Sequence, residues 1–156
     1  MSPRLYCDAN PRMIAYVLDG GGSGYQSLPD GFTAMEAEYM AIIYGLNEYF
    51  LKWNRELDAR QANVTRASKA EAELDHRKDE FFSVGTPSDK TKRPLPPPVL
   101  VLSDNEVVIR QLRREYHIGN DKLRKLAQQV WQMIQNVEVK LEWIPRTENL
   151  AGKMLK

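Results

Sequence analysis

Leu5-Tyr6-Cys7-Asp8-Ala9-Asn10 is the stretch from which the fold and the candidate site of this chain can be worked out. It has the composition of a short β-strand, with Asp8 near its end. Asp104 ends a second apolar run, 99–105, and Glu38 lies near the start of an apolar segment. A buried carboxylate is costly unless its charge is compensated, and a divalent cation compensates several converging carboxylates. We therefore expect Asp8, Glu38 and Asp104 to converge.

Composition limits the class of protein. The chain has 156 residues, 42% of them hydrophobic and 28% charged, as in an ordinary soluble single-domain protein. It contains no apolar run of about 20 residues that would span a membrane, and its first residues lack the pattern of a signal peptide. The single cysteine, Cys7, excludes an internal disulfide and favours a reducing, cytoplasmic location. With one cysteine and two histidines, a metal would need oxygen ligands.

The first third of the chain predicts an antiparallel meander and then a buried helix. Strands are expected at residues 4–9, 12–19 and 25–28, with a glycine-rich turn at 20–24. Residues 34–53 are apolar nearly all round, which indicates a helix buried against the sheet. Thr33 is the expected N-cap, and Glu36 has the spacing of a capping box.

The middle of the chain differs in character. Residues 54–80 are polar with good helix propensity, and they extend the helix or form a helical arm. Residues 83–98 end in a proline-rich stretch that is typical of a connector. We expect one domain over residues 1–156, with an insertion at about 54–98.

The last part of the chain returns to alternating elements. A central strand is expected at 99–103, helices at 105–116 and 122–136, a half-exposed strand at 138–144 and a last helix from residue 150. The predicted fold is α/β: a five-stranded mixed sheet, with three antiparallel strands followed by parallel strands, flanked by helices.

The charge is uneven although the net charge is only +1. Residues 110–125 hold six basic residues against two acidic ones, a local charge of +4. This segment is either a solvated pair of helices or a face that binds a polyanion, and the second reading requires it to lie beside the acidic cluster.

Four local motifs, in order, resemble ribonuclease H, of the type 1 branch of the ribonuclease H-like superfamily. The resemblance covers nearly the whole chain apart from residues 54–98. Each motif is weak alone, and four in order with compatible secondary structure are specific. They are Tyr6-Cys7-Asp8-Ala9, then Ala37-Glu38-Tyr39-Met40-Ala41 with Gly45-Leu46, then Ser103-Asp104-Asn105 with Gln111-Leu112, and Trp143-Ile144-Pro145-Arg146-Thr147-Glu148-Asn149.

The resemblance implies hydrolysis of the RNA strand of RNA–DNA hybrids by a monomeric endonuclease that uses two Mg²⁺ or Mn²⁺ ions. Two such ions about 3.5–4 Å apart activate water and stabilise the leaving 3′ oxygen. Asp8 would bridge the ions, Glu38 and Asp104 would each bind one, and Arg146 would approach the scissile phosphate. The further residues expected to contact nucleic acid are Asn10, Asn105, Arg110, Arg113, Arg114, His117, Lys122 and Asn149.

The chain also departs from the family pattern. The family carries a fourth carboxylate shortly after the position of Asn149, and this chain has no acid there, whether Gly152 or Lys153 is aligned with it. Residues before the family's helix glutamate often read RNA through asparagine, whereas this chain has Ala34 and Met35. The insertion is the third departure. A non-catalytic domain that binds nucleic acid or a protein partner is therefore the alternative.

Each candidate acid also has a purely structural interpretation. Asp8 could cap the turn at Asn10-Pro11, Glu38 could interact only with the helix dipole, and Asp104 could be the N-cap of the following helix. Arg146 could be an exposed loop arginine. Only the joint occurrence of the acids favours a catalytic site.

Overall fold

Strand pairing places the first strand at the centre of the sheet. The computed structural model describes residues 2–72 and 95–155, and it describes the backbone alone at 63–72. The sheet has the order β3-β2-β1-β4-β5, from β1 (Arg4–Asn10), β2 (Met13–Leu18), β3 (Ser23–Ser27), β4 (Val99–Ser103) and β5 (Val139–Trp143). β1, β2 and β3 are antiparallel, and β4 and β5 continue parallel to β1. The predicted mixed sheet of five strands is confirmed.

The register between β1 and β4 brings the two aspartates together. Cys7 pairs with Ser103 across the two parallel strands. Asp8 and Asp104 are the next residues along each strand, so they lie at the same end of neighbouring strands. Parallel pairing thus turns two distant sequence positions into neighbours.

The long helix α1 (Ala34–Ala72) begins with the expected capping box. The Glu36 backbone N–H donates to Thr33 Oγ1 at 3.1 Å, and the Thr33 N–H donates to Glu36 Oε1 at 3.3 Å. Both ends of this reciprocal pair are therefore satisfied, and the helix starts at the residue that the sequence predicts. Its observed end at Ala72 lies beyond the expected Trp53, so the predicted continuation of the helix is observed.

A glycine lets α1 approach the sheet closely. A Cβ atom on Gly45 would lie 3.0 Å from Leu5 Cδ2 and 3.3 Å from Cys7 Sγ. Leu5 and Cys7 therefore face α1, and alternation along the strand points Asp8 the other way. Gly152, in the short C-terminal helix η3 (Leu150–Leu155), lies against Asp8, so η3 is on the face opposite α1.

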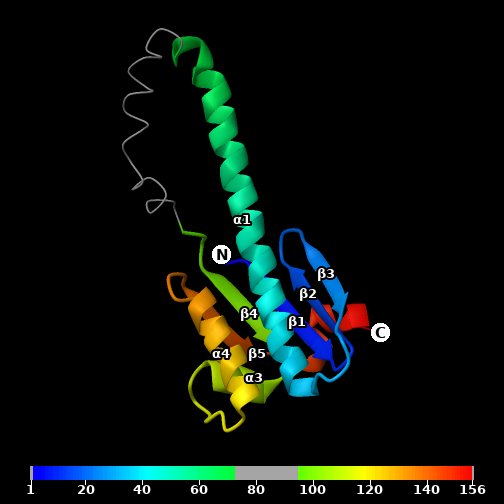
Figure 1. The fold of residues 1–156 in the computed structure, drawn as a ribbon. Coiled ribbons are helices and arrows are strands. Elements are labelled where there is room, and N and C mark those ends of the chain that lie inside the picture. Colours follow the sequence, from blue (N-terminus) through cyan, green and yellow to red (C-terminus); the bar gives the residue numbers. More distant parts are fainter. Residues whose placement is uncertain (1, 73–94, 156) are drawn as a thin grey trace. The chain divides into compact units, whose positions relative to one another are not determined.

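One hydrophobic core joins the helices to the sheet. Its fully buried side chains come from α1, the three central strands, α3 (Glu106–Leu112) and α4 (Asp121–Met133). In Figure 1, α1 crosses β1 and α4 lies beside β5. The largest of them include Tyr39, Leu5, Ile14, Ile42, Leu46, Val99, Val101 and Val130.

Two elements differ from the sequence prediction. The helix expected at 105–116 is α3 (Glu106–Leu112), which ends early because the chain turns at Arg114, whose φ is 64°. The final segment is a 3₁₀-helix instead of an α-helix. Trp143, in the strand predicted at 138–144, is 49% exposed, because β5 is an edge strand.

The chain divides into two compact units, Met1–Phe50 with Pro97–Lys156, and Leu51–Pro96. The first contains the sheet and the candidate site, and the second contains the rest of α1. The predicted proline-rich connector lies mostly outside the described residues. None of the helices in the described part of the chain has both the length and the apolarity needed to cross a membrane.

The α3–α4 loop lies at the end of the sheet where the aspartates lie. Since β4 and β5 are parallel, the chain must run back along the sheet between them, and α4 makes this return. The loop at 113–120 precedes α4 and so stays beyond the C-terminal end of β4 (Figure 1). The basic segment at 110–125 thus begins at the end of the sheet where Asp8 and Asp104 lie, as binding of a polyanion there would require.

A buried hydrogen bond fixes α1 against α3. The Tyr39 hydroxyl donates to Gln111 Oε1 at 2.7 Å, and both side chains are buried. Tyr39→Phe leaves the Gln111 carbonyl without this donor and should lower the free energy of unfolding by about 1–3 kcal/mol. Urea denaturation measures the loss. Tyr25→Phe, at a side chain that is 66% exposed, is the control and should have little effect. Equal stability of both variants would contradict this role.

The segment 56–96 should be dispensable for folding of the first unit. The Tyr49 hydroxyl donates to the Pro97 carbonyl oxygen, so the two chain ends that border the second unit lie close together within the first. A short Gly/Ser linker in place of 56–96 should close this gap at a small entropic cost. We expect one cooperative transition by circular dichroism in urea, and its disappearance would show that the core needs the deleted residues.

Candidate metal centre

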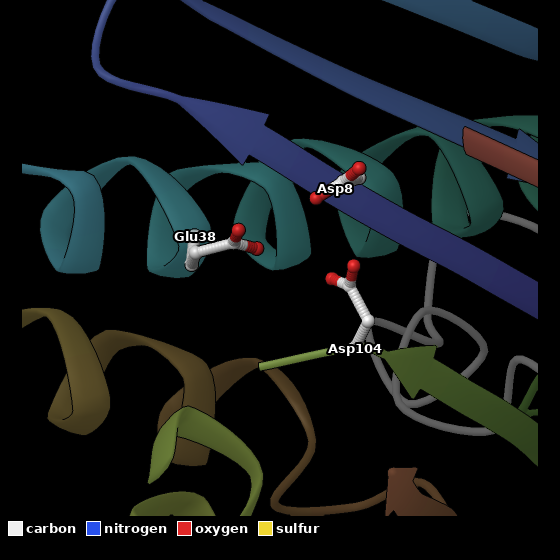
Figure 2. Close-up of side chains that lie close together, drawn as sticks. All are labelled: Asp8, Glu38 and Asp104. Carbon is white, nitrogen blue, oxygen red and sulfur yellow. The ribbon is translucent and has the colours of Figure 1, made fainter. Parts of the chain in front are cut away.

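Three carboxylates from three separate elements meet at one point. One oxygen each of Asp8, Glu38 and Asp104 lies within 4.8 Å of the others. Figure 2 shows the side chains pointing toward one another from β1, α1 and the end of β4. Asp8 and Glu38 are 9% and 7% exposed, and the Asp104 side chain is 8% exposed. The expected convergence is therefore observed.

The Glu38 carboxylate carries the largest electrostatic penalty in this cluster. Burial, followed by the charges of Asp8 and Asp104, raises the pKa of Glu38 from 4.5 to about 9. Within the described part of the chain, no donor makes a hydrogen bond with buried Glu38 Oε2. A buried oxygen without a hydrogen-bond donor fits a site that binds a cation.

The backbone of the next residue, Ala9, holds the Asp8 carboxylate in place. Its Oδ1 accepts a hydrogen bond from the Ala9 N–H at 2.9 Å. Burial and then the charge of Asp104 raise the pKa of Asp8, and the Ala9 N–H opposes them. The turn that Asp8 was considered to cap is closed by Asn10, whose Oδ1 accepts from the Arg12 N–H at 2.9 Å. Asp8 is therefore not the turn cap.

Asp104 is positioned by β5 and the loop after it. The Trp143 indole Nε1–H donates to the Asp104 backbone oxygen at 3.0 Å, and Arg146 Nε lies 3.4 Å from Asp104 Oδ2. The N-cap of α3 is Asn105, whose side chain accepts from the Val108 N–H at 3.1 Å. The helix-cap interpretation of Asp104 is therefore wrong, and Trp143 is a positioning residue that sequence reasoning missed.

A divalent cation fits this donor set. The ligand atoms are carboxylate oxygens, which Mg²⁺ and Mn²⁺ prefer. A cation would offset the repulsion among the three acids and give Glu38 Oε2 a partner. Because the pKa values of Asp8 and Glu38 are both raised, binding should displace protons from the site.

Asn149 is buried next to the site and does not lie on the protein surface. Its side chain is 1% exposed, its Nδ2 donates to the Cys7 carbonyl oxygen at 2.8 Å, and its Oδ1 accepts from the Ala151 N–H at 3.2 Å. These bonds tie the C-terminal segment to the residue before Asp8. The expected contact between Asn149 and nucleic acid is corrected to a framework role, since its polar atoms are already engaged.

The basic segment is partly neutralised by its own acids. Arg110 pairs with Glu106 at 2.9 Å, and Arg113 lies 3.5 Å from Glu115. Arg114 packs over the Trp131 ring, with its guanidinium carbon 4.1 Å from the ring centroid. The segment is therefore a folded surface with internal pairing and offers less free charge than its composition suggests.

Two other predicted contact residues are open to solvent. His117 lies in the α3–α4 loop and Lys122 lies in the first turn of α4, and both side chains are exposed. Asn10 is exposed at the end of β1, whereas Asn105 is half-buried and also contacts Met35 Sδ at 3.6 Å. Accessibility thus favours His117, Lys122 and Asn10 over Asn105 as contacts.

Comparison with known proteins identifies the type of fold to which this structure belongs. A family model described as reverse transcriptase-like matches residues 96–155. None of the curated proteins compared with the sequence matches it. RNase H1 from the archaeon Halobacterium salinarum is similar in structure, with 14% identity, a TM-score of 0.61, and 99% of this chain and 94% of that chain covered.

Two further solved structures agree. The N-terminal RNase H domain of a Mycobacterium tuberculosis protein has 16% identity and a TM-score of 0.58, with 95% of this chain and 85% of that chain covered. LC11-RNase H1, isolated from compost and solved with an RNA/DNA hybrid, has 16% identity and a TM-score of 0.60, with 99% of this chain and all of that chain covered. The fold of this protein is of the ribonuclease H type.

Without metal, Glu38 should destabilise the protein at high pH. Its raised pKa means that the folded chain holds this proton more tightly than the unfolded chain, so the free energy of unfolding falls as pH rises from 4.5 to about 9. In EDTA at pH 8, Glu38→Gln should therefore gain on the order of 1–2 kcal/mol over wild type, or several degrees in Tm.

The stability gain of Glu38→Gln over wild type should be smaller at pH 5, where Glu38 of the folded wild type is protonated. Thermal unfolding by circular dichroism at both pH values checks the difference. Glu138→Gln, at an exposed position before β5, is the matched control and should show no such pH dependence. A Glu38→Gln gain that is independent of pH would contradict the electrostatic cause.

Proposed function

We propose that this protein is a metal-dependent endonuclease that hydrolyses the RNA strand of RNA–DNA hybrids. The observation that carries the proposal is the meeting of Asp8, Glu38 and Asp104, with oxygens within 4.8 Å, at the shared end of β1 and β4. Buried acids that repel one another destabilise a fold, and a site for cations gives their presence a reason. The ribonuclease H type fold supports the same activity.

The chemistry follows from the charge of the substrate. A phosphodiester is anionic, so attack by hydroxide requires charge neutralisation. Mg²⁺ or Mn²⁺ bound here would activate water and stabilise the leaving oxygen, with two ions in the mechanism that the resemblance implies. The new bond joins the water oxygen to phosphorus, and the P–O3′ bond breaks to leave a 5′-phosphate and a 3′-hydroxyl.

Each residue of the site has a role in the proposal. Asp8, between the other two acids and the C-terminal segment, would be the ligand shared between the ions, and Glu38 and Asp104 would each bind one ion. Arg146, 3.4 Å from Asp104 and 91% exposed, is free to turn toward a phosphate. Asp104 thus holds the arginine near the cluster before substrate binds.

The substrate class is supported by one structural neighbour and by the surface around the site. LC11-RNase H1, which has the same fold, was solved with an RNA/DNA hybrid. The basic α3–α4 loop lies at the end of the sheet where the three acids meet, so a polyanion bound at the acids extends toward it. Contacts to the phosphate backbone would come from the exposed residues Asn10, Arg113, Arg114, His117 and Lys122 and from the half-buried Arg110.

A second candidate function is a non-catalytic domain that binds nucleic acid or a protein partner. The observation in its favour is that, among the described residues, the acidic cluster contains three carboxylates and lacks the fourth that the family pattern carries. Such a domain would bind hybrids without cleaving them, so the two functions predict different products.

Cleavage of end-labelled duplexes separates the two functions. Wild type with Mg²⁺ or Mn²⁺ should cut the RNA strand of an RNA–DNA hybrid and leave the DNA strand intact. Asp8→Asn removes a ligand charge and should lower cleavage by at least about 100-fold while the circular dichroism spectrum is unchanged. Asp30→Asn, at an exposed loop position, is the control and should cleave as wild type does. Full activity of Asp8→Asn would refute the assigned role, and hybrid binding without cleavage by wild type would favour the second function.

A further inference from the structure

A separate pocket opens on another side of Asp8. Its volume is about 350 Å³, and its lining includes Asp8, Asn10, Arg146, Thr147, Gly152 and Lys153. Glu38 and Asp104 do not line it. Asp8 therefore has one side toward the acidic cluster and another toward this pocket, which we call the Asp8 pocket.

The charge of the Asp8 pocket is opposite to that of the cluster. Of the described residues that line it, Asp8 is the only acid, whereas Arg146 and Lys153 are both cations. A divalent cation needs several anionic oxygens to replace its hydration shell, and two neighbouring cations repel it. An anion such as a phosphate group is attracted to the same place.

The close approach of the Gly152 backbone to Asp8 explains why Lys153 contributes positive charge to the pocket. A Cβ atom at position 152 would lie 2.8 Å from Asp8 Oδ2, so no side chain fits there unless Asp8 moves. Gly152 thus lets the η3 backbone pack against Asp8, and the next residue, Lys153, lines the pocket with an exposed side chain. Of the two positions where a fourth acid was sought, a side chain at 152 would require Asp8 to move, and 153 carries a positive charge.

Arg146 connects the pocket to the acidic cluster. Its Nε lies 3.4 Å from Asp104 Oδ2, and the same side chain lines the Asp8 pocket. An anion in the pocket would therefore meet the Arg146 guanidinium on one side and the Lys153 ammonium on another. Arginine recognises phosphate through its planar fork and lysine does so as a point charge.

We infer that Lys153 and Arg146 bind a phosphate group of the substrate in the Asp8 pocket, and that Lys153 supplies there the positive charge that a second divalent cation would supply. The centre would then hold one cation, bound by Asp8, Glu38 and Asp104, and Lys153 would lie on the other side of Asp8. This inference rests on the proposed function for its substrate, and it refines the two-ion mechanism to one ion and one ammonium.

The number of ions is measured on the complex with bound nucleic acid. The probe is Mn²⁺, added to wild type with an RNA–DNA hybrid whose RNA strand carries 2′-fluoro groups and resists cleavage. Two Mn²⁺ ions about 4 Å apart are magnetically coupled, whereas a single ion gives the spectrum of an isolated centre in electron paramagnetic resonance. We expect the isolated spectrum in wild type, and a coupled pair would overturn the inference.

The role of Lys153 is measured by the affinity for the same hybrid. Lys153→Ala should weaken binding about tenfold and lower the salt dependence by about one phosphate contact, with the Mn²⁺ spectrum unchanged. Lys153→Arg should restore the affinity. Lys140→Ala is the matched control, because Lys140 is an exposed lysine on β5 that does not line the Asp8 pocket. Equal affinities of Lys153→Ala and Lys140→Ala would overturn the inference.

The two proposals fail in different ways. Binding of the hybrid without cleavage would defeat the nuclease, while loss of affinity in Lys153→Ala would still support the phosphate site. Cleavage accompanied by a coupled pair of Mn²⁺ ions would keep the nuclease and defeat the single-ion inference.

Discussion

The repulsion among three buried carboxylates is the constraint on which the rest of this structure depends. Asp8, Glu38 and Asp104 hold oxygens within 4.8 Å of one another at a place where water is largely excluded. Burial and mutual charge raise the pKa of Asp8 and Glu38, which is a free-energy penalty on the folded chain at neutral pH. The fold therefore has to hold these groups together against their own electrostatics until a cation compensates them.

The surrounding framework does this through a few close packing contacts and hydrogen bonds. Gly45 lets α1 lie close to β1, so Glu38 reaches the strand ends. The Tyr39–Gln111 hydrogen bond fixes α1 to α3, and Trp143 holds the backbone of Asp104 from β5. Asn149 joins the C-terminal segment to the strand just before Asp8. Gly45 and the Tyr39–Gln111 bond position Glu38 through α1, whereas Trp143 supports Asp104 and Asn149 supports Asp8. The cluster is thus positioned from several elements at once.

Charge changes sign across Asp8. On one side lie the other two acids, and on the other lie Lys153 and Arg146 around a pocket of about 350 Å³. A cation needs anionic partners and the phosphate it acts on needs cationic partners. Asp8 alone separates these two environments. Gly152 makes this possible because it brings the chain against Asp8 without a side chain of its own.

The sequence by itself determined the secondary-structure elements and identified the three acids of the candidate site. The apolar runs that end in Asp8 and Asp104, and the capping box at Thr33 and Glu36, are local patterns whose physics acts within a few residues. The mixed sheet and the convergence of the acids were also predicted, because the first and fourth strands of such a sheet can be neighbours, and parallel neighbours share their C-terminal ends. The tertiary structure alone decided that Asn149 is buried, that Trp143 is exposed and bonded to Asp104, and that Lys153 lines a pocket beside Asp8. These features depend on contacts between residues more than 35 positions apart, as in the pair of Asp104 with Trp143 at a separation of 39, and no local pattern encodes which distant group a side chain will meet.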